Sequence, residues 1–181
     1  MGVAGLAISL GAQALIKDYF SGMMILVENQ FNVGDEIQLP DVTGTVEMVT
    51  LRTTFLRDIR GKLFIIPNGD IRIVANNTRA WRKALVELNL PVDVSEEEIV
   101  GALEITAEKI NQDPKIRALI IEPIDINYWN NVTEWSRQVR LTAKTTAEGV
   151  GRVEIAMRKH AIETLSEKGI SMASPVQKVI S

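Results

Sequence analysis

The chain has 181 residues, 46% of them hydrophobic, which is enough for a packed core in one large domain or two small ones. Its net charge of −3, from 20 basic and 23 acidic residues, is too balanced for a nucleic-acid binder with a basic face. The absence of cysteine excludes disulfides, zinc–thiolate sites and cysteine nucleophiles, and a single histidine excludes a multi-histidine metal site.

Residues 2–16 carry no charge and are rich in Gly and Ala, which predicts a helix of small side chains. Leu6 and Leu10 are four residues apart and share one face. Small residues flank this leucine ridge on both sides: Ala7 and Gly11, and Gly5 and Ser9. Such stripes let helices approach closely, above all in membranes. A ring of identical helices with both leucines pointing inward and a tightly packed core helix fit the pattern equally well.

The uncharged run is shorter than the ~20 residues that span a bilayer. A signal peptide is disfavoured, because the small-x-small pattern at residues 12–14 is not preceded by a positive segment. An ordinary buried helix and the end of a membrane helix, with Met1 as an introduced start, both remain open.

Residues 19–27 continue after Lys17 and Asp18 with apolar side chains at helical spacing: Phe20, Met23, Met24 and Val27. The pattern predicts an amphipathic helix. Its apolar side could pack in a core or lie along a membrane surface.

Between Phe31 and Gly69 the pattern changes to short strands separated by turn signals. The strand candidates are Glu36–Leu39, Gly44–Val49, Leu51–Ile59 and Leu63–Ile66. Short strands with closely spaced glycines predict a small barrel.

The last hundred residues follow the order β-α-β-β-α-β of a ferredoxin-like split βαβ domain. Ser95 and Glu98 form a capping box for the first helix, and Gly169 suits the C-cap of the second. The expected elements are a strand at 85–92, a helix from Ser95 to Asp113, strands at 116–128 and 132–142 joined by a turn at Asn130–Asn131, a helix at 149–168 and a short strand at 176–180.

No catalytic pattern emerges from the sequence. It has no phosphate-binding GxxxxGK[ST] loop and no GxSxG elbow. The acidic run Glu96–Glu98 fits a solvated first helical turn, and His160 has no second ligand nearby. Trp129 and Trp135 flank a strand turn as packing anchors. We therefore expect no enzyme activity, no cofactor and no metal.

The blocks between Phe31 and Gly69 resemble the MscS family of small-conductance mechanosensitive ion channels. They read Phe31-x-Val33-Gly34-Asp35-x-Ile37, Gly44-Thr45-Val46-Glu47, Leu51-Arg52-Thr53-Thr54-x-Leu56-Arg57, Gly61-Lys62 and Ile66-Pro67-Asn68-Gly69. The helix before them is similar to the pore-lining helix of that family, and a weaker resemblance extends through the C-terminal region.

The resemblance implies roles for residues of the first helix. Leu6 and Leu10 match two leucine rings that form a hydrophobic pore constriction. Ala7 and Gly11 match small residues that let neighbouring pore helices slide. The family often has a glycine after the glutamine at its helix kink. Here Gln13 is followed by Ala14, so the hinge candidates are Gln13, Ala14 and Gly22.

The resemblance also implies an α+β fold in three parts. Residues 1–27 would form the pore-lining helix and an amphipathic half-helix, 28–83 an Sm-like β domain, and 84–181 a ferredoxin-like α/β domain with a C-terminal strand that would add to a small barrel on the symmetry axis. The charges agree with a boundary near Lys83, with nine basic and eight acidic residues up to it and eleven and fifteen after it.

By the same resemblance, the chain is expected to belong to a homoheptamer in the inner membrane, with most of the chain on the cytoplasmic side. The channel would open under membrane tension and release ions and small solutes on hypo-osmotic shock. Because the family senses tension through helices that precede the pore helix, we expect a truncated form of a longer protein.

The alternative is a soluble binding module, since Sm-like and ferredoxin-like folds also occur in nucleic-acid proteins. The acidic C-terminal half speaks against a nucleic-acid partner. The partners expected are copies of the same chain and the lipid bilayer.

Overall fold

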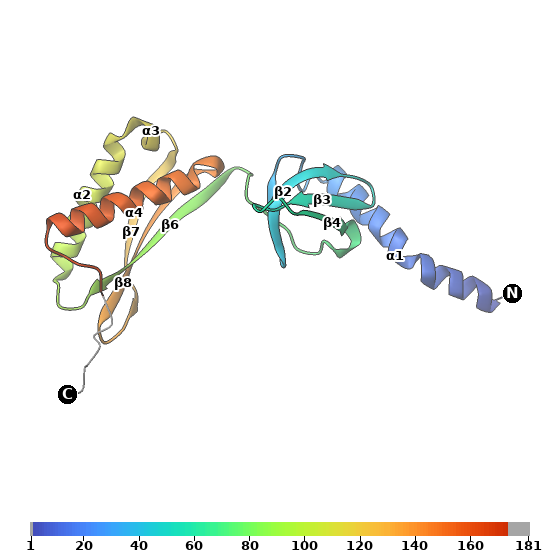
Figure 1. The fold of residues 1–181 in the computed structure, drawn as a ribbon, viewed down its shortest axis with the longest axis horizontal. Helices are drawn as coiled ribbons and strands as arrows, with labels where there is room; N and C mark the ends of the chain where they lie inside the picture. Colours follow the sequence, from blue (N-terminus) through green and yellow to red (C-terminus); the bar gives the residue numbers. More distant parts are fainter. Residues whose placement is uncertain (1, 174–181) are drawn as a thin grey trace. The chain divides into compact units, whose positions relative to one another are not determined.

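The computed structural model describes residues 2–173, with side chains for 12–127 and 131–173 (Figure 1). The chain divides into two compact units, Met1–Arg79 and Ala80–Ser181. The change in charge near Lys83 therefore lies close to a structural boundary.

The first unit begins with helix α1, Gly2–Val27, which joins both predicted apolar stretches without interruption. The charged pair between the stretches is accommodated because Lys17 is exposed and Asp18 has a buried hydrogen-bond partner. Helix α1 ends in a Schellman motif: Gln30 N–H donates to the Ile25 carbonyl at 3.1 Å, and Asn29 adopts a left-handed φ of 53°.

A five-stranded antiparallel sheet follows, in the order β4-β3-β2-β1-β5. A register shift between Val46 and Met48 marks a bulge in β2. The bounds are β1 Glu36–Leu39, β2 Val42–Val49, β3 Thr53–Arg57, β4 Leu63–Pro67 and β5 Ala75–Asn76, with a 3₁₀ turn η1 at Asn68–Asp70. The four predicted strands are present, whereas the two-residue strand β5 has no signal of its own in the sequence.

The core of this unit consists of side chains from α1, its following loop and the sheet: Ile25, Phe31, Ile37, Leu39, Val46 and Leu56. The strand residues in this set follow the alternation of each strand, so one face of the sheet is buried.

The second unit has helices on one face of a three-stranded antiparallel sheet with the order β6-β8-β7 (Figure 1). Its elements are β6 Trp81–Pro91, α2 Glu96–Gln112, α3 Pro114–Arg117, β7 Ile120–Val132, β8 Ser136–Thr146, a 3₁₀ turn η2 Ala147–Gly149 and α4 Val150–Glu167. This order confirms the ferredoxin-like arrangement, and with the first unit it confirms the α+β class.

Local signals in this unit act as predicted at both helices. The Ser95 hydroxyl accepts a hydrogen bond from Glu98 N–H at 3.3 Å, and the buried positions of α2 include Ile99, Leu103 and Ile110. Gly169 follows α4 with a φ of 74°, as a glycine C-cap does. The short strand expected at 176–180 lies outside the described residues.

The predicted bounds of the two central strands are wrong by about four residues. Asp113 ends α2 and also caps the next helix, α3. Its side chain accepts a hydrogen bond from Lys115 N–H at 2.9 Å, and Pro114 occupies the first position of α3. The next strand therefore begins at Ile120. Its turn is not at Asn130–Asn131, which lie within β7, but after Thr133, whose N–H donates to the Ser136 carbonyl at 2.7 Å.

Candidate functional site

The second half of α1 is fixed to the sheet at the turn η1. The buried carboxylate of Asp18 accepts a hydrogen bond from Gly69 N–H, with 3.0 Å between Oδ1 and N. One residue earlier, Lys17 Nζ lies 3.7 Å from Asp70 Oδ1 in an exposed ion pair. A surface pair of this kind stabilises little, so the buried Asp18–Gly69 bond sets the register between helix and turn.

Gly22 brings the helix backbone against the sheet one turn later. A Cβ atom at this position would lie 2.0 Å from the Leu51 carbonyl oxygen and 2.4 Å from Nδ2 of Asn68. No side chain fits there unless the backbone moves. The close approach gives Gly22 a structural reason to be glycine, whereas its predicted role as a hinge stays a prediction.

Asn68 forms the floor of this junction and is fully buried. Its Nδ2 donates to the Thr50 carbonyl at 2.9 Å, and its Oδ1 accepts from the hydroxyl of Thr54 at 2.8 Å. Its backbone N–H donates to the Arg52 carbonyl at 2.9 Å. Both ends of the side-chain amide are satisfied, so the turn that receives Asp18 is held rigidly by the sheet.

The predicted pore residues Leu6, Ala7, Leu10 and Gly11 belong to α1, but their side chains lie outside the described residues. Gln13 and Ala14 are exposed and sit in the uninterrupted part of the helix. The pore and hinge assignments stay predictions.

The face of α1 turned away from the junction is apolar and exposed. Phe20 is 61% exposed and Val27 is 75% exposed. Other exposed apolar residues of the helix are Leu15, Ile16, Tyr19, Met23, Met24 and Leu26. Tyr19, Phe20 and Met23 also line a shallow groove together with Leu51. A continuous apolar surface of this kind marks a contact with lipid or another protein. Among the described residues, no helix is both long and apolar enough to cross a membrane.

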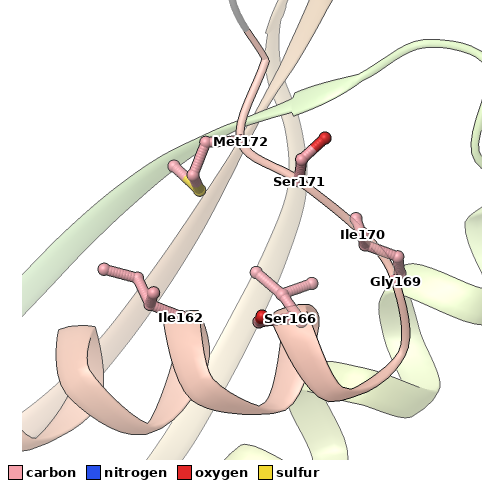
Figure 2. Close-up of a pocket in the computed structure, with 7 residues that line it drawn as sticks. Ile162, Ser166, Gly169, Ile170, Ser171 and Met172 are labelled. Carbon is pink, nitrogen blue, oxygen red and sulfur yellow. The ribbon is translucent and has the colours of Figure 1, made fainter.

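Chemistry-bearing side chains in the described part do not converge. No group of three or more His, Asp or Glu residues there is placed to hold a metal ion. His160 lies 3.2 Å from the Glu163 carboxylate on the same helix. A groove beside the end of α4 has Ile162 and Ser166 on the helix and Met172 on the following segment, whose side chain extends towards Ile162 (Figure 2). It offers hydroxyl and apolar groups without a nucleophile–base pair.

Sequence reasoning missed the partners of the junction. In the sequence, Lys17 and Asp18 are a charged pair between two apolar stretches, and Asn68–Gly69 are the last residues of the region of short strands and turns. The available signals were a carboxylate inside an otherwise apolar helix and a glycine at Gly22 within it. Neither signal shows that the two segments, 51 positions apart in the chain, meet.

Comparisons with known proteins agree with this architecture. Residues 14–79 match the model of the "Mechanosensitive ion channel, beta-domain" family. The small-conductance mechanosensitive channel of Caldanaerobacter subterraneus subsp. tengcongensis is 34% identical over 99% of this chain and 62% of its own length. The small-conductance mechanosensitive channel MscMJ of Methanocaldococcus jannaschii is 26% identical over 99% of this chain and 51% of its own length.

The fold is that of a solved channel as well. The crystal structure of Helicobacter pylori MscS in its closed state superposes with a TM-score of 0.83 at 17% identity, covering 99% of this chain and 70% of that one. The chain thus spans between about half and two thirds of the lengths of the two named channel relatives. From the matching β-domain, the relatives along its whole length and the shared fold, this chain belongs to the MscS family of mechanosensitive channel proteins.

Proposed function

We propose that this chain is the pore-lining helix and cytoplasmic cage of an ion channel that opens under membrane tension and releases ions and small solutes on hypo-osmotic shock. The observation that carries the proposal is the exposed apolar face of α1 opposite its buried contacts with the sheet. Such a face requires a cover, and neighbouring copies of α1 together with lipid would supply one.

In the proposed assembly, seven copies of α1 surround a pore in the inner membrane, and most of the chain lies on the cytoplasmic side. Leu6 and Leu10 form two stacked apolar rings about one helical turn (~5.4 Å) apart. Rings of this kind block ions by expelling water, without a charged gate. Ala7 and Gly11 let adjacent helices slide as the rings widen, and Gln13, Ala14 or Gly22 supplies the bend.

The three predicted parts take separate roles in this proposal. Residues 1–27 form the gate and the amphipathic half-helix, residues 28–83 the Sm-like β domain that holds it, and residues 84–181 the ferredoxin-like domain of the cage. The Asp18–Gly69 bond and the close approach at Gly22 support the view that the second half of α1 and the β domain act as one block.

The test is a patch-clamp recording of the complete gene product, under graded suction, in cells that lack their own mechanosensitive channels. We expect a pressure-activated current, and Leu10→Ser should lower the opening pressure because a hydroxyl wets the constriction. Ile59→Ser, at an exposed site of the β domain outside α1, is the control.

A membrane-inserted protein without any pressure-activated current would refute the channel proposal and favour a channel-like scaffold that acts as a binding module instead. Equal opening pressures for Leu10→Ser and Ile59→Ser would remove Leu10 from the constriction.

A further inference from the structure

The last residues of the first unit are bonded to the loop that ends α1. Asn76 Nδ2 donates to Asp35 Oδ2 at 2.8 Å and to the Gln30 carbonyl at 3.4 Å. The hydroxyl of Thr78 accepts a hydrogen bond from Glu36 N–H at 2.7 Å. We call residues 76–79 the exit strap, because the second unit starts at the next residue.

The strap is folded on itself as well as on the loop. The side-chain carbonyl of Asn76 accepts from the backbone N–H groups of Thr78 at 2.9 Å and Arg79 at 3.1 Å, forming an Asx-type turn. Asn77 N–H donates to the Glu36 carbonyl at 2.8 Å. These hydrogen bonds restrict the backbone of the strap and hold it against the loop after α1 and the start of β1.

Arg79 completes the connection at the helix end itself. Its guanidinium Nη2 donates to the backbone carbonyl of Asn29, the left-handed residue that closes the Schellman motif of α1. A cation at a helix C-terminus also interacts favourably with the helix dipole. The next residue, Ala80, has a φ of 57°, a conformation that L-residues rarely adopt outside specific turns. The chain therefore leaves the first unit from a point fixed to the end of α1.

We propose that Arg79 is a positioning residue for gating: its bond to Asn29 makes the point where the chain enters the α/β unit move with the end of α1. The bond joins the end of α1 directly to the strap, although 50 positions separate the two bonded residues in sequence. This inference rests on the proposed channel function and adds to it the route by which helix movement reaches the second unit.

Two variants with the same change of charge separate the bond from general electrostatics. Arg79→Ala removes the guanidinium at the helix end. Arg72→Ala is the matched control, an exposed arginine of the same unit for which the described residues provide no hydrogen-bond or ion-pair partner. Both should fold, because both side chains are exposed.

The first measurement is hydrogen exchange of the complete gene product in detergent. In Arg79→Ala, the amides around Gln30 and in the exit strap should exchange on the order of tenfold faster than in wild type, given the strength of a charge-assisted bond. Arg72→Ala should leave them unchanged. Unchanged protection in Arg79→Ala would overturn the bond itself, whatever the protein does in a membrane.

The second measurement is the pressure dependence of the current. The open-to-closed ratio at the wild-type midpoint pressure should change on the order of tenfold in Arg79→Ala, with unitary conductance unchanged, because the bond lies outside the proposed pore. Faster exchange with gating equal to that of Arg72→Ala would overturn the coupling role. A wild type without current would instead refute the proposed channel function, while the exchange result still decides whether the bond exists.

Discussion

Among the described side chains, the α/β unit buries 17 apolar residues in one cluster, whereas the first unit buries six. The buried polar side chains differ in kind, since those described in the α/β unit are all hydroxyls, whereas the first unit also buries a carboxylate and an amide. In the α/β unit, Thr106 donates to the Ala102 carbonyl of its own helix at 2.9 Å. In the first unit, Asp18 and Asn68 bond to segments distant in the chain.

The two units thus illustrate two kinds of stabilising interaction, apolar packing and buried hydrogen bonds. A large apolar core is non-directional and tolerates small shifts, whereas a few buried hydrogen bonds fix one register between segments. The first unit, which carries the proposed gate helix, relies on the second kind. Substitutions can break each kind of contact separately.

The largest loss of stability is expected in the α/β core. Leu103→Ala removes a fully buried side chain of α2 and should lower the free energy of unfolding of this unit by about 2–5 kcal/mol. Urea unfolding of the chain, followed by hydrogen exchange in α2, measures it. Ile155→Ala, at an exposed site of α4, is the control and should cost far less. Similar losses at both sites would contradict the assigned core.

Glycine substitutions should have opposite signs in the two units. Gly22→Ala places a methyl group on the Leu51 carbonyl and should destabilise the helix–sheet junction by about 1–3 kcal/mol. Gly101→Ala, in α2 where a Cβ meets nothing, should stabilise by about 0.5–1 kcal/mol through helix propensity. Thermal unfolding of the two variants gives both values, and a stabilising Gly22→Ala would show that α1 does not approach Leu51 so closely.

Removing the hydrogen-bond acceptor at Asp18 should lower the free energy of unfolding by about as much as Gly22→Ala does, or by less. Asp18→Ala leaves the Gly69 N–H unpaired, with an expected cost of about 1–3 kcal/mol. Asp18→Asn keeps an acceptor oxygen and should lose only part of this. Faster hydrogen exchange at Gly69 in the alanine variant, and little change in the asparagine variant, is the expected result. Equal effects of both variants would point to the negative charge instead of the hydrogen bond.

The smallest effect is a pH dependence at the surface of the sheet. Hydrogen bonds from Arg57, including Nη2 to Glu47 Oε2 at 2.9 Å, lower the pKa of Glu47 below its ordinary value of 4.5. A carboxylate with a depressed pKa contributes stability above its unfolded-state pKa, and this is lost as the pH falls through the folded pKa.

A titration of the Glu47 carboxyl followed by NMR should therefore show a midpoint below 4.5. In Arg57→Gln the midpoint should rise towards that value, because the guanidinium donors are lost. Because the pair is exposed, the change in stability should be slight and should decrease further in salt. A midpoint that is the same in both proteins would exclude Arg57 as the cause.

The sequence by itself determined the elements whose signals are local. Short strand patterns separated by turn signals predicted four of the five strands of the first sheet, and Ser95 and Gly169 marked helix ends at positions that the structure confirms. The family was also accessible, because its motifs lie close together between Phe31 and Gly69. Local signals failed at Asp113–Pro114, where the same residues can end one helix and start another.

Tertiary structure alone decided the contacts on which the proposed function of those elements depends. The periodicity of α1 does not show that Asp18 meets Gly69, that Gly22 lies against Leu51, or that Arg79 bonds to the Asn29 carbonyl. Each contact joins segments tens of residues apart, and a side-chain pattern records which face of an element is apolar but not which distant backbone it meets. The position at which a buried carboxylate or a glycine is required depends on that distant partner. The physical reason for such a residue is therefore evident only in the folded chain.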